Sequence, residues 1–144
     1  MNTIKTFFIA SLMAITVAGT FTACKKGSDD PEISLKTRKD RFTNTWTLVK
    51  YEKNGVEQDI SGSTYIYNVF NTGALTQTIE GSIFGFPTRT VNDGNWSFLN
   101  EDEDVNITIG SSSTIYNIQR LASKELWLKK TVNADVHIYF YDGL

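Results

Sequence analysis

The sequence predicts an all-β domain, an eight-stranded antiparallel up-and-down meander closed into a small barrel. Eight short segments alternate apolar with polar residues, which is typical of strands with one buried face. The connections between them are rich in turn-forming residues and are too short for the crossover that parallel strands require. Closure is expected because an open meander would leave two exposed edge strands. An open sandwich of the same strands is the alternative.

The strands are clearest at 105–109 and 136–140, where three apolar residues fall on one face. In the second of these, Ile138 and Phe140 are expected to face the interior and His137 the outside. The other segments are rich in β-branched and aromatic residues, which favour strands. They are 45–52, 64–70, 74–79, 95–99, 114–121 and 124–130.

Turn signals separate these segments at close spacing. Asn-Gly and Asp-Gly pairs supply the positive φ angles that tight hairpins need. Turns are therefore predicted at 54–55, 71–73, 92–94, 100–104, 110–113, 122–124 and 133–135.

Residues 82–88 (SIFGFPT) interrupt this alternation. They place Ile83, Phe84 and Phe86 among glycines and a proline, which is too irregular for a continuous central strand. Two interpretations remain open. The segment is either an apolar loop at the barrel mouth, acting as a lid or a protein contact, or a bulged strand turned inward.

Large apolar side chains are expected inside the barrel. Eight strands enclose a space that side chains can fill or that can hold one small ligand. Core packing is therefore the first interpretation of each aromatic residue. The expected inward set is Trp46, Leu48, Phe70, Trp96, Phe98, Ile107, Ile109, Tyr116, Ile118, Leu126, Leu128, Ile138 and Phe140.

Ligand-binding candidates come from the aromatic residues. A tyrosine presents a flat apolar body with a polar tip, which suits the rim of a binding site or a partner surface. Tyr139 and Tyr141 are candidates on this ground, although they are expected on the outer face. The predicted ligand-binding residues are Tyr65, Tyr67, Phe84, Phe86, Trp96 and Tyr116.

The start of the chain has the layout of a secretory signal peptide. Lys5 precedes an apolar run at 7–21 that ends in small residues before Cys24. The run is interrupted by polar residues and falls short of the roughly 20 apolar residues of a membrane-spanning helix. The predicted parts are a cleaved signal peptide at 1–23, a flexible tether at 24–41 that includes one helical turn after Ser34, and a single domain at 42–144.

The residues FTAC at 21–24 resemble the lipobox of bacterial lipoproteins, whose cysteine carries acyl chains such as palmitate. The resemblance implies that Cys24, the only cysteine, anchors the protein to a membrane, because two or more acyl chains hold a protein stably there. It also implies a place in the cell envelope, on the outer membrane. The pair Asp29 and Asp30 resembles signals for the outer face of that membrane, and a solvated charge run is the equal alternative.

Composition argues against nucleic-acid binding and catalysis. Residues 42–144 carry seven basic and twelve acidic side chains, whereas a nucleic-acid-binding surface is basic. His137 is the only histidine, and the sequence has no nucleophile elbow and no phosphate-binding glycine loop. We therefore expect no enzymatic activity and no cofactor.

One acidic cluster has the spacing of half a calcium loop, at Asn100, Asp102, Asp104 and Asn106. Val105 stands where the sharp-turn glycine of such a loop belongs. We therefore expect a solvated hairpin turn there and no metal site.

Residues 42–144 as a whole resemble the small lipocalin-like lipoproteins of Gram-negative bacteria. The resemblance lies in TNTWTLVKYEKNG, VFNTGALTQ, GNWSF, NITIG and SKELWLK. In lipocalins a Gly-x-Trp begins the first strand and its tryptophan plugs the closed end. Trp46 matches that role, with Asn44 in place of the glycine, while Arg120 lies too early to match the late arginine of the family. The resemblance implies a lipocalin-like barrel that binds something apolar.

Two hypotheses for function follow. In the first, the anchored barrel binds a small hydrophobic ligand at the cell envelope. In the second, the barrel is filled and the protein is a structural or interaction accessory that docks to another envelope protein. The amount of empty space inside the barrel distinguishes them.

Overall fold

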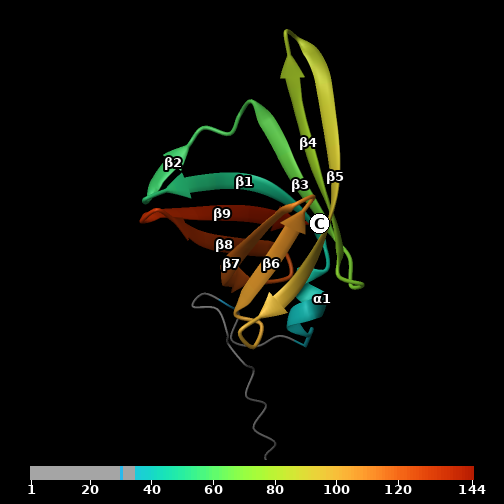
Figure 1. Cartoon of the computed structure of the whole chain (residues 1–144), viewed down its shortest axis with the longest axis vertical. Coiled ribbons are helices and arrows are strands. Elements are labelled where there is room, and N and C mark those ends of the chain that lie inside the picture. The colour runs from blue at the N-terminus through green and yellow to red at the C-terminus, as the bar shows by residue number, and fades with distance from the viewer. Residues whose placement is uncertain (1–29, 31–34) are drawn as a thin grey trace, which may run out of the picture.

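The computed structural model describes residue 30 and residues 35–144 (Figure 1). This part of the chain forms one short helix and nine strands. They are α1 (Arg38–Phe42), β1 (Thr45–Lys53), β2 (Val56–Gln58), β3 (Ser63–Val69), β4 (Ala74–Ile83), β5 (Phe86–Leu99), β6 (Asp104–Ile109), β7 (Ser112–Leu121), β8 (Glu125–Val132) and β9 (Asp135–Gly143). The predicted signal peptide at 1–23 and Cys24 lie outside the described residues.

The strands form a single antiparallel sheet that closes into a barrel. The sheet order is β2-β1-β3-β4-β5-β6-β7-β8-β9, and β1 also pairs with β9, from Trp46 opposite Gly143 to Lys53 opposite His137. Each predicted strand is present. The eight-stranded closed meander is therefore confirmed, and β2 is added to it as a short hairpin with the end of β1.

β4 and β5 form a long hairpin that projects beyond the barrel (Figure 1). Its turn is at Phe84 and Gly85, whose φ angles of 52° and 82° suit a tight two-residue turn. We call residues 82–88 the arm tip. Neither predicted conformation of this segment is found, because it is neither a loop at the mouth nor an inward bulge but the exposed end of a regular hairpin. A contact with another protein stays a prediction.

The predicted turn at 92–94 is also wrong, because these residues lie inside β5. At Gly94 a Cβ atom would lie 2.3 Å from the carbonyl oxygen of Thr108 in β6. The glycine therefore permits the close approach of two strands, which is the other common reason for a glycine in a sheet.

The end of the barrel beside α1 is plugged by aromatic rings, and we call this end the base. Trp46 is fully buried, and its indole Nε1 donates to the carbonyl of Phe42 over 2.9 Å. The Phe42 ring lies 4.7 Å from that of Trp96 and 5.4 Å from that of Phe98. Trp46 thus closes the barrel as the resemblance implied, with Phe42 from the helix beside it.

The inner face of β9 is the opposite of the one predicted. Tyr139 and Tyr141 face the core, whereas Phe140 packs on the outside against Trp127, with ring centroids 5.3 Å apart. The reason lies at Gly143, where a Cβ atom would be 2.7 Å from the Trp46 ring. Because alternate residues share a face, a glycine held under Trp46 turns residues 139 and 141 inward with it.

Most of the other residues expected inside are found there. Residues Leu48, Trp96, Phe98, Ile107, Ile109, Tyr116, Ile118, Leu126 and Leu128 belong to the core or pack on it. Phe70 is 48% exposed at the end of β3 and was wrongly placed inside. Ile138 shares the outer face of β9 with Phe140.

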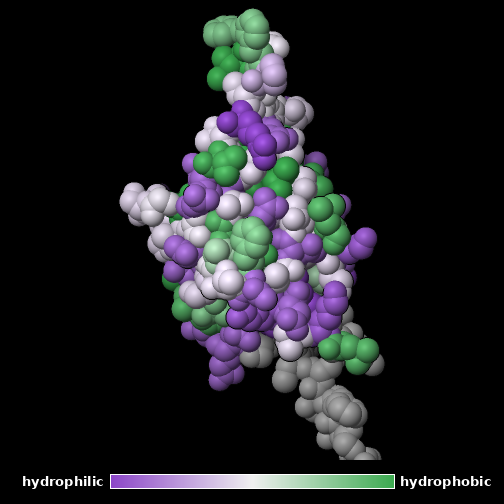
Figure 2. Space-filling model, turned by 90° about the vertical axis from the view of Figure 1, so that its right-hand side faces the viewer, coloured by the Kyte–Doolittle hydropathy of each residue, from purple (hydrophilic) through white to green (hydrophobic). Residues whose placement is uncertain are grey.

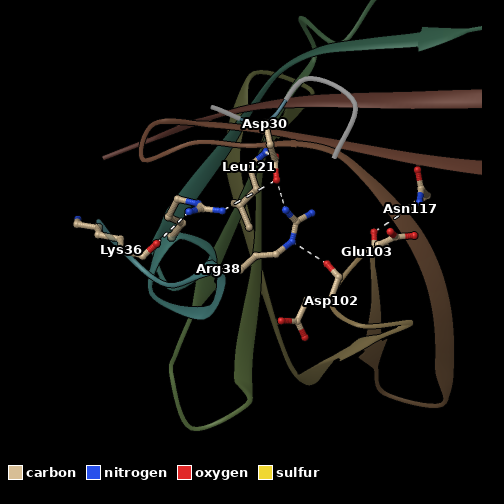
Figure 3. A network of polar contacts seen from close by, with 8 residues as sticks. Asp30, Lys36, Arg38, Asp102, Glu103, Asn117 and Leu121 are labelled. Carbon is tan, nitrogen blue, oxygen red and sulfur yellow. Dashed lines mark hydrogen bonds and ion pairs between the residues drawn. The ribbon is translucent and has the colours of Figure 1, made fainter. Parts of the chain in front are cut away.

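The described part of the predicted tether contacts the base (Figure 3). Asp30 is 4% exposed, and its carboxylate accepts from the Leu121 backbone N–H over 2.6 Å and from the Arg38 guanidinium. Arg38 also donates to the carbonyl of Asp102 over 2.7 Å. The expected helical turn is α1. In the part of the chain that the structure describes, no helix is long and apolar enough to cross a bilayer.

Candidate functional site

A cavity of about 510 Å³ occupies the barrel beyond the aromatic plug. Every tyrosine of the chain lines it, and the plug residues do not. These tyrosines are Tyr51, Tyr65, Tyr67, Tyr116, Tyr139 and Tyr141. The interior is therefore filled at the base and hollow toward the other end, which we call the mouth.

The cavity forms where β1 and β3 separate. The two strands pair only at residues 45–47 with 66–68, and beyond this β1 pairs with β2 while β3 continues with β4 alone. Figure 1 shows β1 and β3 running apart. The loop between β2 and β3 spans this gap, and Asp59, Ile60 and Gly62 from it line the cavity.

A β-bulge in β1 places the first tyrosine in the cavity. Leu48 pairs with Tyr141 and Lys50 with Phe140, so Val49 is an extra residue in β1. The bulge reverses the alternation, and Tyr51 rather than Lys50 points inward. Its ring stacks on that of Tyr139 at a centroid distance of 4.9 Å.

Further ring contacts make the tyrosines a continuous wall. Tyr116 meets Tyr139 edge to face with centroids 5.9 Å apart, and Tyr67 lies 5.6 Å from Tyr141. These separations are in the range of favourable aromatic pairs. The wall crosses from β7 through β9 to β1 and β3, so strands far apart in the sequence build one surface.

Burial keeps four of the tyrosine hydroxyls protonated. Burial raises the pKa of Tyr67, Tyr116 and Tyr141 above the ordinary phenol value, and it raises the pKa of Tyr139 to about 12. Gln77 donates to the Tyr67 hydroxyl over 3.4 Å. Near neutral pH the wall therefore offers neutral phenols that can donate hydrogen bonds.

Two nitrogen-bearing side chains lie against this wall. Lys130, on the inner face of β8, has its ammonium 5.5 Å from the ring centroid of Tyr116 and 5.4 Å from that of Tyr139. His137 Nδ1 lies 2.6 Å from the hydroxyl of Tyr51, and the two rings are stacked. The prediction that His137 faces outward was therefore wrong, for the same reason as for its neighbours in β9.

The predicted ligand-binding residues separate into three places. Tyr65, Tyr67 and Tyr116 line the cavity. Trp96 lies in the plug and donates to the Phe70 carbonyl over 2.8 Å. The two phenylalanines of the arm tip, Phe84 and Phe86, are 96% and 74% exposed.

Sequence reasoning missed Tyr51, Gln77 and Lys130 as site residues. One signal for the wall was available, because Tyr65 with Tyr67 and Tyr139 with Tyr141 are spaced by two, and such pairs share a strand face. No sequence pattern near Tyr51 predicts the β-bulge that turns its side chain inward.

The acidic turn after β5 gathers no metal-binding group. Asn100 donates to the Asp104 carboxylate, and the carbonyl of Asp102 accepts from Arg38. Among residue 30 and residues 35–144, no group of three or more His, Cys, Asp or Glu side chains is placed to hold a metal ion.

Comparison with known proteins identifies the fold. No family model matches the sequence, and no curated protein matches it. Among solved structures, the chain is similar to a lipocalin-like protein from Bacteroides uniformis, with a TM-score of 0.54 and 12% sequence identity. The match covers 72% of this chain and 99% of that one. The fold is lipocalin-like. At this identity the likeness extends to the fold, and the lipoprotein character implied by the lipobox stays a prediction.

Proposed function

We propose that this protein binds one small, largely apolar molecule in the tyrosine-lined cavity. The observation that supports the proposal is the cavity itself, about 510 Å³ bordered by every tyrosine of the chain. Small-molecule sites are commonly about 300–1,000 Å³, with apolar and aromatic walls and a few polar groups. Tyrosine rings with hydroxyls and one amide, from Gln77, fit that description.

Contact with the tyrosine wall can contribute several kcal/mol to the free energy of ligand binding. Removing about 200 Å² of ligand apolar surface from water contributes about 5 kcal/mol, before the cost of association. The plug at the base limits how deep a ligand can reach, so a ring-sized group is better suited than a long chain. The tyrosine rings that border the cavity then offer aromatic contacts.

The same wall argues for binding without catalysis. The neutral phenols are weak bases, and His137 is engaged with the Tyr51 hydroxyl. No nucleophile paired with a base faces the cavity among the residues that line it. We therefore propose a carrier or receptor domain, not an enzyme.

We further propose that Cys24 is acylated and holds the protein on the outer membrane. Asp30 is fixed on the base, and the six Cα–Cα steps from Cys24 to Asp30 span at most about 22 Å when extended. An anchor at Cys24 would therefore keep the base near the membrane and leave the mouth on the far side, open to ligands.

A dye titration tests the binding proposal. The protein from residue 24 onward, which we call the mature chain because residues 1–23 are the predicted signal peptide, carries Cys24→Ser and is titrated with the neutral fluorophore N-phenyl-1-naphthylamine. The variant Ser63→Trp fills the cavity from the β3 wall. Ser97→Trp, on the exposed outer face of β5, is the matched control. We expect saturable one-to-one binding that Ser63→Trp abolishes and Ser97→Trp retains. Equal binding by both variants would contradict the proposal.

A second candidate function, docking to another envelope protein, is favoured by the arm tip. Ile83, Phe84 and Phe86 are exposed together there, and Figure 2 shows hydrophobic atoms at the end of this projection. The arm tip carries no charged side chain. Replacement of both phenylalanines by serine is expected to abolish cross-linking to an envelope partner while leaving dye binding in the cavity intact. Unchanged cross-linking would refute this alternative.

A further inference from the structure

One lysine, Lys130, lies directly beside the tyrosine wall of the cavity. The Lys130 ammonium lies over the rings of Tyr116 and Tyr139, both of which line the cavity. In the described residues it makes no ion pair, whereas the nearby Lys53 is paired with Asp135 at 2.7 Å. A half-buried cation without a carboxylate partner in the described residues therefore lies against two rings of the cavity wall, next to the space that a ligand would occupy.

The cavity's own carboxylate does not neutralise this lysine. Asp59 lines the mouth from the β2–β3 loop, where it is exposed and accepts from the Ser61 backbone N–H over 2.8 Å. Water screens the charge of an exposed group far more than that of a half-buried one. The interior near Tyr116 and Tyr139 is therefore electropositive.

Neutral phenols add hydrogen-bond donors to this cation. The Tyr51 hydroxyl is engaged with His137. A phenol hydroxyl that does not already donate within the wall can donate to an oxygen of the ligand. An anionic oxygen strengthens such bonds, because charge-assisted hydrogen bonds are shorter and about twice as strong as neutral ones. A positively charged ligand is disfavoured, since Lys130 already covers the ring faces that would attract it.

We propose that the cavity selects amphiphiles with a ring-bearing apolar body and one anionic oxygen group, a carboxylate or a sulfonate. Lys130 binds the anionic group, the hydroxyls of Tyr116 and Tyr139 donate to it, and the apolar body lies against the tyrosine wall. This inference rests on the function proposed above. Lys130 is then the residue that determines charge selectivity.

Two dyes with the same arylamine frame distinguish the effect of ligand charge on binding from the effect of ligand shape. The first, 8-anilinonaphthalene-1-sulfonate, carries a sulfonate on the arylamine frame that N-phenyl-1-naphthylamine presents without charge. Binding is measured in the mature chain carrying Cys24→Ser, on a background of Phe84→Ser and Phe86→Ser that removes the exposed arm tip as a dye site.

Substitutions on the two faces of β8 provide the matched variants. Lys130→Met keeps the apolar stem and removes the charge, Lys130→Arg retains the charge, and Lys129→Met removes a charge from the outer face. We expect the sulfonate dye to bind at least about tenfold tighter than the neutral dye, as one charged hydrogen bond implies. The preference should vanish in Lys130→Met and persist in Lys130→Arg and Lys129→Met.

The outcomes distinguish this inference from the proposed function. If both dyes bind equally well, or if the preference survives in Lys130→Met, the selectivity inference is overturned while cavity binding stands. If neither dye binds the folded protein, both the proposed ligand binding and the charge selectivity assigned to Lys130 are refuted. Unchanged affinity for the neutral dye in Lys130→Met excludes a general loss of structure.

Discussion

Substitution of Gly143 by alanine tests the register that turns the tyrosines inward. A Cβ atom at Gly143 would lie 2.7 Å from the Trp46 ring and 2.5 Å from the Asn44 amide nitrogen. Ordinary contacts of this kind are 3.4–4 Å, so the indole must retreat by roughly 0.7–1.3 Å in a close-packed base. Overpacking of this kind costs about 1–3 kcal/mol.

The assay is urea unfolding followed by tryptophan fluorescence. Gly62→Ala is the matched control, because a Cβ atom there meets nothing within 4 Å. We expect Gly143→Ala to lower the free energy of unfolding by about 1–3 kcal/mol and Gly62→Ala to leave it unchanged or raise it by less than about 1 kcal/mol. Equal effects of the two substitutions would refute the reasoning that β9 lies under Trp46.

A double-mutant cycle localises the clash. Trp46→Phe removes the part of the ring that the new methyl group meets. Gly143→Ala should then cost less on the Trp46→Phe background, with a coupling energy of about 1 kcal/mol. Additive effects would place the strain elsewhere.

Three further predictions concern the base, the phenols and the arm tip. Asp30→Ala should cost about 3–5 kcal/mol in urea unfolding, because it leaves Arg38 buried without its carboxylate partner. Tyr139, with a folded pKa of about 12 against about 10 when unfolded, stabilises the fold fully below pH 10 and loses that contribution toward pH 12. Stability measured across this window should fall, and a flat profile would refute burial of the phenols. Phe84→Asn, which suits φ 52° better, should raise the melting temperature by a few degrees in calorimetry; a lower value would argue against the tight turn.

The fold was predictable because its signals are local and repeated. Period-two alternation and short connections determine antiparallel strands, and the exposed edges of a meander favour closure. Trp46 could be placed at the closed end because a tryptophan early in the first strand resembles the lipocalin pattern.

The faces of individual strands were less predictable. In β9 both faces carry rings, since Tyr139 and Tyr141 alternate with Ile138 and Phe140, and hydropathy favours the wrong set. The deciding contact, Gly143 against Trp46, joins residues at opposite ends of the domain. No local pattern contains that information.

The cavity was only partly predictable for a related reason. Five of its six tyrosines were candidates from the sequence, but two of these were expected on the outer face. The gap depends on where β1 leaves β3, and Tyr51 depends on a bulge at Val49. Lys130 also looks like any solvated strand residue until the face of β8 is known. These features follow from long-range pairing, not from composition.

Native mass spectrometry of the mature chain after incubation with an envelope lipid extract tests the central claim most directly. The account predicts one added mass of small-molecule size that survives gentle activation, is absent from Ser63→Trp and is retained by Ser97→Trp. A bare folded protein recovered from the extract, or an added mass that persists in Ser63→Trp, would contradict ligand binding in the tyrosine-lined cavity.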